Sequence, residues 1–307
     1  MQWTGVMPAL TTAFDENLKV DHAFVARHAK WQVENGVSGL VALGSLGEAA
    51  TLTHSEKLEL IKTLIAAADN KVPVVAAISA LSTDDAVALA SDAATHGAKG
   101  LRILPPYVYK GDWAEMKAHV AAVLRATPLT AMLYNNPVAY GTDFTPEQIA
   151  ELAAEFRNLQ AVKESSTDVR RVTAIRALLG DRLNIFVGVD DCIVEGIAAG
   201  AVGWVAGLVN AFPKESVDLF ELASKGKHQE AFELYRWFLP LLRMDTAPKF
   251  IQLIKQVQQE LGTGSARVRA PRLELAGTEL ADTRAAVAHA QSTRPKVAIP
   301  STAFVAQ

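Results

Sequence analysis

A lysine and a tyrosine each stand at the end of an apolar run in this sequence. The run "LTAMLY" ends on Tyr134, and the run "LQAVK" ends on Lys163. A lysine at the end of a buried strand is partly desolvated, which disfavours its ammonium form and lowers its pKa. A neutral amine can attack a carbonyl carbon to form a Schiff base, and a nearby phenol can carry protons to and from the adduct. The pair indicates covalent chemistry on a carbonyl compound.

Each of the two residues also has a simpler explanation. Lys163 could pair with Glu164 or extend its ammonium group to solvent. Tyr134 could be a buried tyrosine whose hydroxyl bonds to the backbone. Their expected position at the same end of adjacent strands favours the catalytic interpretation.

A glycine-rich turn follows an earlier apolar run, in "GSLGEAATLTHSEK". Gly44 and Gly47 allow a tight turn whose backbone N–H groups point inward, which suits a carboxylate. Ser45 adds a hydroxyl group beside them. A plain glycine turn, followed by a helix that starts at Thr53 or His54, explains the same residues.

Two further loops carry polar or aromatic side chains. In "VGVDDC", Gly188 leaves room for a substrate, and Asp190 and Asp191 could bind its hydroxyl groups or cap the next helix. In "LPPYVYKGDW", the proline pair forces an extended loop that presents Tyr107 or Tyr109. Either tyrosine could line this site, line that of a neighbouring subunit, or lie on the surface.

Short apolar runs alternate with longer amphipathic segments along the chain, which predicts a parallel α/β fold. We expect eight strands, near 5–10, 38–43, 73–79, 99–104, 129–134, 159–163, 184–188 and 202–206. Helices are expected near 21–35, 54–69, 83–96, 111–126, 146–155, 167–179 and 190–199. Eight such units predict a (β/α)₈ TIM barrel, whose active site lies at the carboxyl ends of the strands. An open doubly wound sheet is the alternative, but no glycine-rich loop follows the first strand.

The remainder of the chain predicts a C-terminal helical appendage. Helical patterns recur near 213–224, 227–240, 247–261 and 276–290. We therefore expect a barrel over 1–210, helices packed on it over 211–290, and an extended or mobile tail over 291–307.

Composition excludes several classes of protein. The 307 residues carry a net charge of −3, so the sequence has no basic footprint for nucleic acid or for anionic lipid. Cys192 is the only cysteine, and the histidines show no metal-ligand spacing. The sequence begins without a signal-peptide pattern, and the glycine-interrupted segment 196–212 is short for a membrane span, so we expect a cytoplasmic protein.

Four motifs, "GSLGE", "YNNP", "VKESS" and "GVDD", occur in this order at the expected strand ends. Together they resemble the dihydrodipicolinate synthase / N-acetylneuraminate lyase family over roughly residues 4–275. The resemblance implies that Lys163 forms a Schiff base with a 2-keto acid and that Tyr134 relays protons. It also implies that Ser45, with the backbone of Leu46 and Gly47, holds the substrate carboxylate.

The same resemblance implies a homotetramer without metal or organic cofactor, in which Tyr107 reaches across a dimer interface. Asn136, in the loop after the tyrosine, and Gly188, Asp190 and Asp191 are expected to contact the substrate. No other macromolecular partner is expected.

Two departures from the family pattern bear on the substrate. Dihydrodipicolinate synthases usually read GTTGE and carry an arginine two residues after the YNVP proline, whereas this chain has Leu46 and Ala139. Loss of that guanidinium removes a bidentate clamp for a second carboxylate. "GSLGE" together with "YNNPVAYGTD" looks most like the 1-pyrroline-4-hydroxy-2-carboxylate deaminases of hydroxyproline breakdown.

The sequence therefore predicts a cyclic 2-imino acid as substrate and 2-oxoglutarate semialdehyde and ammonia as products. The same lysine could instead serve an aldolase or dehydratase that acts on sialic acid or a 2-keto-3-deoxy sugar acid, or dihydrodipicolinate synthesis. A catalytically silent keto-acid-binding barrel is the non-enzymatic alternative.

Overall fold

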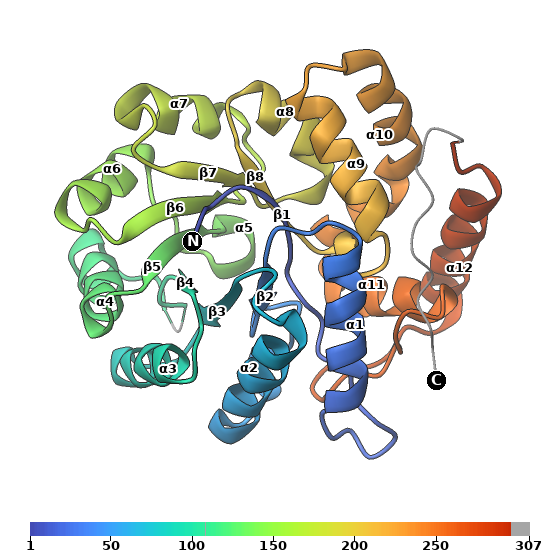
Figure 1. Cartoon of the computed structure of the whole chain (residues 1–307), viewed down its shortest axis with the longest axis horizontal. Coiled ribbons are helices and arrows are strands. Elements are labelled where there is room, and N and C mark those ends of the chain that lie inside the picture. The colour runs from blue at the N-terminus through green and yellow to red at the C-terminus, as the bar shows by residue number, and fades with distance from the viewer. Residues whose placement is uncertain (108, 296–307) are drawn as a thin grey trace.

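A computed structural model of the chain describes residues 1–107 and 109–295. Eight parallel strands form one sheet in the order β1-β8-β7-β6-β5-β4-β3-β2, and helices surround it (Figure 1). A parallel bridge between Ala9 and Val41 brings the two ends of the sheet together. The predicted (β/α)₈ barrel is confirmed. The strands are β1 Gly5–Pro8, β2 Leu40–Ala42, β3 Val74–Ile78, β4 Gly100–Ile103, β5 Thr130–Asn135, β6 Leu159–Glu164, β7 Asn184–Val187 and β8 Gly203–Ala206.

The helices that follow the strands lie close to their expected positions. They are α1 His22–Glu34, α2 His54–Ala68, α3 Thr83–Thr95, α4 Trp113–Ala126, α5 Pro137–Tyr140, α6 Pro146–Glu155, α7 Arg170–Leu179 and α8 Ile193–Ala198. Short 3₁₀ turns are η1 Ala49–Thr51, η2 Asp190–Cys192, η3 Leu208–Asn210 and η4 Arg243–Thr246. Helix α2 begins at His54, one of the two predicted starts, and Thr53 caps it in a complete capping box with Glu56.

Two local predictions were wrong. The segment 190–199 is not one helix, because the first three residues form the 3₁₀ turn η2 and only Ile193–Ala198 are α-helical. The stretch after Tyr134 is not an open loop. Pro137 starts the short helix α5, and the Asn136 side chain accepts a hydrogen bond from the Ala139 N–H at its start.

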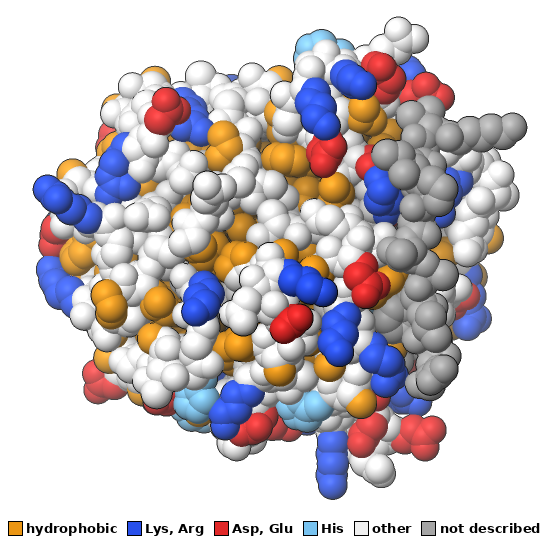
Figure 2. All heavy atoms as spheres, viewed as in Figure 1, with side chains coloured by type: hydrophobic (Ala, Val, Ile, Leu, Met, Phe, Trp, Pro, Cys, Tyr) orange, Lys and Arg blue, Asp and Glu red, His pale blue; other side chains and the backbone are white. Residues whose placement is uncertain are grey.

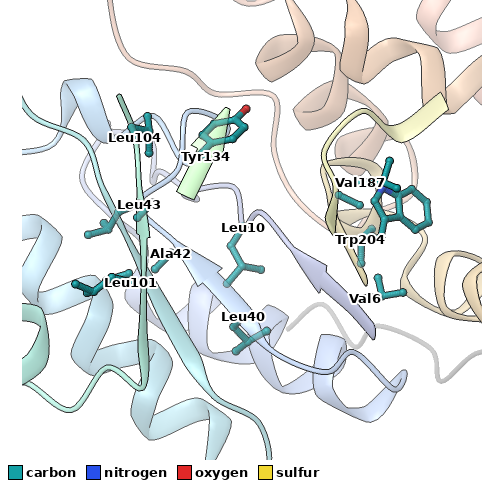
Figure 3. Packing of buried hydrophobic residues seen from close by; sticks show 14 of the residues in the cluster. Val6, Leu10, Leu40, Ala42, Leu43, Leu101, Leu104, Tyr134, Val187 and Trp204 are labelled. Carbon is teal, nitrogen blue, oxygen red and sulfur yellow. The ribbon is translucent and has the colours of Figure 1, made fainter. Parts of the chain in front are cut away.

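Alternate residues of each strand face opposite sides of the barrel wall. Leu101 and Ile103 of β4 belong to the large apolar cluster between strands and helices, part of which Figure 3 shows. A second cluster fills the barrel interior and includes Met7, Met132 and Phe186. Side-chain direction alternates along a strand, and the two neighbours of Arg102 on β4 face the helices. Arg102 therefore points into the barrel interior.

The C-terminal helices contribute to the barrel interior as well as covering its outside. They are α9 Pro213–Ser224, α10 His228–Leu242, α11 Phe250–Glu260 and α12 Gly277–Ser292. Ile251 and Ile254 of α11 pack in the interior cluster with Leu46. Helices α11 and α12 lie together on one side of the barrel in Figure 1. The domain limits stay a prediction, and residues 296–307 of the expected tail lie outside the described residues.

The described surface carries both signs of charge. On the face drawn in Figure 2, lysine and arginine side chains are interspersed with aspartate and glutamate. Among the described helices, none is both long and apolar enough to cross a membrane.

Candidate functional site

A cavity of about 470 Å³ lies at the carboxyl ends of the strands. Its walls come from several strands, from the glycine turn, from α5 and from the C-terminal segment around η4. Predicted site residues that line it are Ser45, Leu46, Tyr134, Asn136, Lys163 and Gly188. The barrel topology therefore gathers these residues, which are up to 143 positions apart in the sequence, as strand-end reasoning predicts.

Lys163 and Tyr134 are direct partners in the register of β5 and β6. The lysine is only 5 % exposed, and its Nζ lies 4.5 Å from the centroid of the tyrosine ring. Burial, reinforced by the positive charge of Arg102, lowers the pKa of Lys163 to about 7. A substantial fraction of the amine is therefore neutral, and nucleophilic, near neutral pH.

The Tyr134 hydroxyl accepts a hydrogen bond from Asn136 Nδ2 at 2.9 Å. Because the Asn136 carboxamide also caps α5, its position is fixed from both sides. Burial raises the pKa of Tyr134, so the phenol keeps its proton while the site is empty. This arrangement gives Asn136 a positioning role toward the phenol, in addition to its place on the cavity wall.

The glycine turn holds Ser45 and Leu46 at the cavity. Ser45 Oγ is hydrogen-bonded to the hydroxyl of Tyr140, a residue of α5. Gly47 lies behind the cavity, where a side chain would meet the Leu10 carbonyl oxygen at 2.8 Å. Glycine is needed at this position for backbone packing.

A buried carboxylate anchors the turn. Glu48 is fully buried and has left-handed backbone geometry, with φ of 54°. Its carboxylate accepts hydrogen bonds from Lys255 Nζ at 2.7 Å and from the Arg269 N–H at 3.0 Å, and Arg272 lies 3.9 Å away. Residues from the end of the chain thus fix the conformation of the turn.

The polar residues of the loop after β7 make hydrogen bonds within the protein, and Gly188 makes room for neighbouring side chains. A Cβ atom at Gly188 would overlap Ser165 Oγ and lie 2.6 Å from Lys163 Cε, so this glycine makes room for both side chains. Asp190 is buried, and its carboxylate accepts hydrogen bonds from the Trp204 indole and from the N–H groups of Gly207 and Leu208. Neither aspartate is among the residues that line the cavity.

Asp191 is tied to the C-terminal helices. Its carbonyl oxygen accepts a hydrogen bond from the Tyr235 hydroxyl, and its carboxylate lies 3.7 Å from Arg243. Substrate contact by Asp190 or Asp191 stays a prediction, and the bonds described here hold the end of β8 and helix α10 in place.

Tyr107 lies beside α5 within its own chain. Its hydroxyl accepts a hydrogen bond from Ser79 Oγ at 3.3 Å, and its ring centroid is 5.8 Å from that of Tyr140. The Tyr140 ring in turn packs edge-on against Tyr134 at 5.9 Å. Ser45, Tyr140 and Tyr134 therefore form a connected polar and aromatic wall, in which Tyr140 was not predicted.

Three charged residues of the cavity, Arg102, Asp245 and Arg272, were also missed. Arg102 comes from the middle of β4 and lies with its guanidinium carbon 4.8 Å from the Tyr134 ring centroid. An arginine inside the apolar run "GLRIL" was a visible signal. Asp245 of η4 packs against Gly207, and burial raises the pKa of its carboxyl to about 6. The C-terminal segment gave no sequence signal that it folds over the barrel mouth.

The sequence and the fold were compared with known proteins. A sequence profile of the dihydrodipicolinate synthetase family matches residues 2–290, nearly the whole chain. The chain belongs to the dihydrodipicolinate synthetase family. It is therefore a lyase of this family, in agreement with the four motifs.

Individual members of the dihydrodipicolinate synthetase family give the same result. The 4-hydroxy-tetrahydrodipicolinate synthase of Bartonella bacilliformis is 31 % identical over 286 residues, which are 93 % of this chain and 97 % of that protein. The solved structure of the enzyme of that name from Methylacidiphilum fumariolicum SolV is 25 % identical, with a TM-score of 0.91 over 95 % of this chain and 97 % of the other. A monomeric dihydrodipicolinate synthase variant aligns with a TM-score of 0.88 at 25 % identity, over 94 % and 97 % of the two chains.

Proposed function

We propose that this enzyme binds a 2-oxo or cyclic 2-imino acid through a Schiff base on Lys163. The observation that carries the proposal is the environment of the amine. Lys163 is buried beside a phenol on the cavity wall, and no described carboxylate lies within ion-pair distance of it. A lysine that served only to balance charge would have such a partner.

The proposed substrate is 1-pyrroline-4-hydroxy-2-carboxylate. Lys163 attacks C2, and the bond between C2 and the ring nitrogen breaks to leave a primary amine on C5. The protonated Schiff base makes the C3 proton acidic, so that this proton and the 4-hydroxyl group leave as water. After the double bond migrates to C5, water releases ammonia there and frees the lysine at C2. Overall, one substrate molecule and one net water molecule are converted to one 2-oxoglutarate semialdehyde and one ammonia.

The walls of the cavity supply groups for the proton transfers. Tyr134, linked through the aromatic wall to Ser45, exchanges protons at C3. Asp245 has a pKa of about 6, near enough to neutrality for it to protonate the departing 4-hydroxyl group. Its position on η4 puts this acid on the C-terminal side of the cavity.

The cavity wall favours a substrate with a single carboxylate. Ala139 lines the cavity at the position where the family resemblance implies an arginine for a second carboxylate. Leu46, together with Phe250 and Ile251, makes one wall apolar. These features support the deamination.

A second candidate is condensation of pyruvate with an aldehyde, as in the 4-hydroxy-tetrahydrodipicolinate synthases. The names of the relatives favour this reaction over deamination. Both reactions begin with attack by Lys163, so substrate preference must separate them.

Reductive trapping tests the Schiff base. The protein would be incubated with pyruvate, reduced with borohydride and analysed by mass spectrometry after proteolysis. We expect one adduct, on Lys163, and none in Lys163→Met. An unmodified protein at saturating pyruvate would favour the silent binding barrel instead.

A substrate panel separates the reactions. It contains hydroxypyrroline carboxylate, sialic acid, 2-keto-3-deoxy sugar acids, and pyruvate with aspartate semialdehyde. Ammonia release from the first compound alone supports the deaminase. Consumption of pyruvate with the semialdehyde would establish the second candidate, and pyruvate release from a sugar acid would establish an aldolase.

We also propose that the enzyme acts in the cytoplasm as a homotetramer in which Tyr107 lies near a subunit interface. The family resemblance supports this assembly. Light scattering of the purified protein tests it, and a monomer that retains full activity would refute any need for a neighbouring subunit.

A further inference from the structure

Among the described residues, Arg102 is a buried cation without a counterion. Its side chain is 1 % exposed, and it borders the cavity. Within residues 1–107 and 109–295, its Nε and Nη1 atoms have no hydrogen-bond partner, and no carboxylate lies within ion-pair distance. Two unpartnered donor atoms and a full positive charge thus lie in the wall beside the cavity.

The guanidinium lies between the two parts of the proposed site. On one side it abuts Gly44, where any side chain would collide with Arg102 Nη2. On the other side it is 4.8 Å from the Tyr134 ring centroid, and Lys163 Nζ is 4.5 Å from the same centroid. The register places Arg102 beside Met132, two residues below Tyr134 on β5, so the arginine reaches the site from the barrel floor.

An uncompensated guanidinium is costly to bury, and substitution of apolar residues for buried charges is often neutral or stabilising. The contact with the Tyr134 ring offsets part of this cost, but it does not replace an anionic partner. Arg272, which also borders the cavity, differs because it lies 3.9 Å from Glu48. Of these two arginines, Arg102 is the one that lacks an anion.

We propose that Arg102 binds the carboxylate attached to the carbon atom that Lys163 attacks. This inference rests on the proposed Schiff-base function. A guanidinium can hold a carboxylate through two parallel N–H···O bonds, which fixes its orientation as well as its charge. Because Arg102, Lys163 and Asp245 line the same cavity, a substrate held in this way lies beside both of the other groups.

The proposal gives Gly44 a specific purpose. Glycine at this position lets the guanidinium approach the turn, so that Arg102 and the backbone of Ser45 and Leu46 can share one carboxylate. A substrate whose carboxylate is replaced by a carboxamide would leave the guanidinium unpaired and should bind poorly.

Binding of an unreactive acid tests the proposal directly. Pyrrole-2-carboxylate has a flat five-membered ring and no electrophilic C=N bond, so it cannot form a Schiff base. Its dissociation constant would be measured by calorimetry for the wild type, Arg102→Met and Arg102→Lys, with pyrrole-2-carboxamide as the uncharged comparison. Arg125→Met, which removes an exposed arginine of α4, is the matched control for net charge.

We expect Arg102→Met to weaken the binding of pyrrole-2-carboxylate about 10- to 100-fold and to leave the binding of the carboxamide unchanged. Arg102→Lys should recover part of the loss, because it restores the charge without the bidentate geometry. Arg125→Met should bind as the wild type does. Equal carboxylate affinity in Arg102→Met and wild type, or no binding of the acid by the wild type, would overturn the proposal.

Borohydride trapping with pyruvate, run on the same proteins, separates this inference from the proposed function. If the wild type forms no adduct, and Arg102→Met binds pyrrole-2-carboxylate more weakly than the wild type does, the Schiff base is refuted and the carboxylate site is retained. If Arg102→Met forms the adduct at the same pyruvate concentrations as the wild type, the Schiff base is retained and the carboxylate site is refuted. Thermal unfolding checks that each variant is folded.

Discussion

Two buried basic side chains approach the glycine turn, one from strand β4 and one from helix α11, and their surroundings differ. Lys255 is 1 % exposed, and its Nζ donates hydrogen bonds to Glu48 at 2.7 Å and to the Thr12 carbonyl at 2.9 Å. Arg102 is equally buried and has no such partner among the described residues. The paired charge holds the turn in shape, whereas the unpaired charge is free to receive a ligand.

The same contrast extends to the acidic residues and to Lys163. Glu48 is buried with several donors around it, while Asp245 borders the cavity with no described cation within ion-pair distance. Burial raises the pKa of Asp245 to about 6 and lowers that of Lys163 to about 7. Groups with shifted pKa values and no fixed partner are therefore concentrated in the cavity, as expected of a catalytic site.

The comparison is tested most strongly at Lys163. Lys163→Met should reduce turnover at least about 10⁴-fold, since the proposed reaction has no other nucleophile. Steady-state kinetics on the substrate found in the panel would measure the loss. Residual turnover within a factor of about 10 of the wild type is incompatible with a Schiff base on this residue.

Stability against pH gives an independent check on the same lysine. With a pKa of about 7 in the folded protein and an ordinary value of 10.5, Lys163 binds fewer protons when folded than when unfolded. Its contribution to the free energy of unfolding therefore rises as pH increases from about 7 toward 10.5. Urea unfolding should show a smaller rise in Lys163→Met, and an identical pH dependence would mean that the amine is not desolvated.

Breaking the paired charge should chiefly affect folding. Lys255→Met leaves Glu48 buried without its main counterion, and we expect a loss of about 3–5 kcal/mol in the free energy of unfolding. Arg102→Met should show no comparable loss, because it removes an unpaired charge. Urea denaturation of both variants measures the difference, with Glu48→Gln/Lys255→Met expected to recover part of the stability. If Lys255→Met and Arg102→Met lower the free energy of unfolding equally, the distinction between a paired and an unpaired buried cation is wrong.

Asp245 tests the acidic half of the comparison. Asp245→Asn keeps the size of the side chain but removes its proton exchange, and turnover should fall about 100-fold. Adduct formation with pyruvate at saturation should persist, because the lysine is intact. Single-turnover measurements separate the two steps, and unaltered turnover would show that another group protonates the leaving hydroxyl.

The smallest expected effect is a shift in pH dependence. Arg102 disfavours the ammonium form of Lys163, so Arg102→Met should raise the pKa of the lysine. The rate of adduct formation with pyruvate would then reach half of its maximum at a higher pH than in the wild type. Arg125→Met serves as the control, and a shift to lower pH would contradict the proposed proximity of the two cations.

The barrel could be predicted because the information is local. Each strand is a short apolar run, each helix has its own periodicity and cap, and the strand ends then place Lys163 and Tyr134 together without any further assumption. Arg102 could also have been found, since its parity on β4 follows from its neighbours. Arg102 lies within its strand rather than in the loop that follows it, and its long side chain reaches the cavity from there.

Other features depend on contacts that no local pattern encodes. Asp245 reaches the cavity only because helix α10 ends and η4 crosses the barrel mouth. Asp190 was predicted as a possible ligand or cap, and only the tertiary fold shows its bonds to the end of β8. Likewise, the pairing of Tyr140 with Ser45 joins helix α5 to the glycine turn across 95 positions of the sequence.

The anchoring of Glu48 has a consequence for how the enzyme is made. The turn forms from residues near position 45, but the groups that fix it, at positions 255, 269 and 272, leave the ribosome long after it does. Until they emerge, a nascent barrel carries an acidic side chain with no counterion in its interior. We therefore expect ribosome-bound chains that stop before residue 255 to be inactive, however many strands they contain.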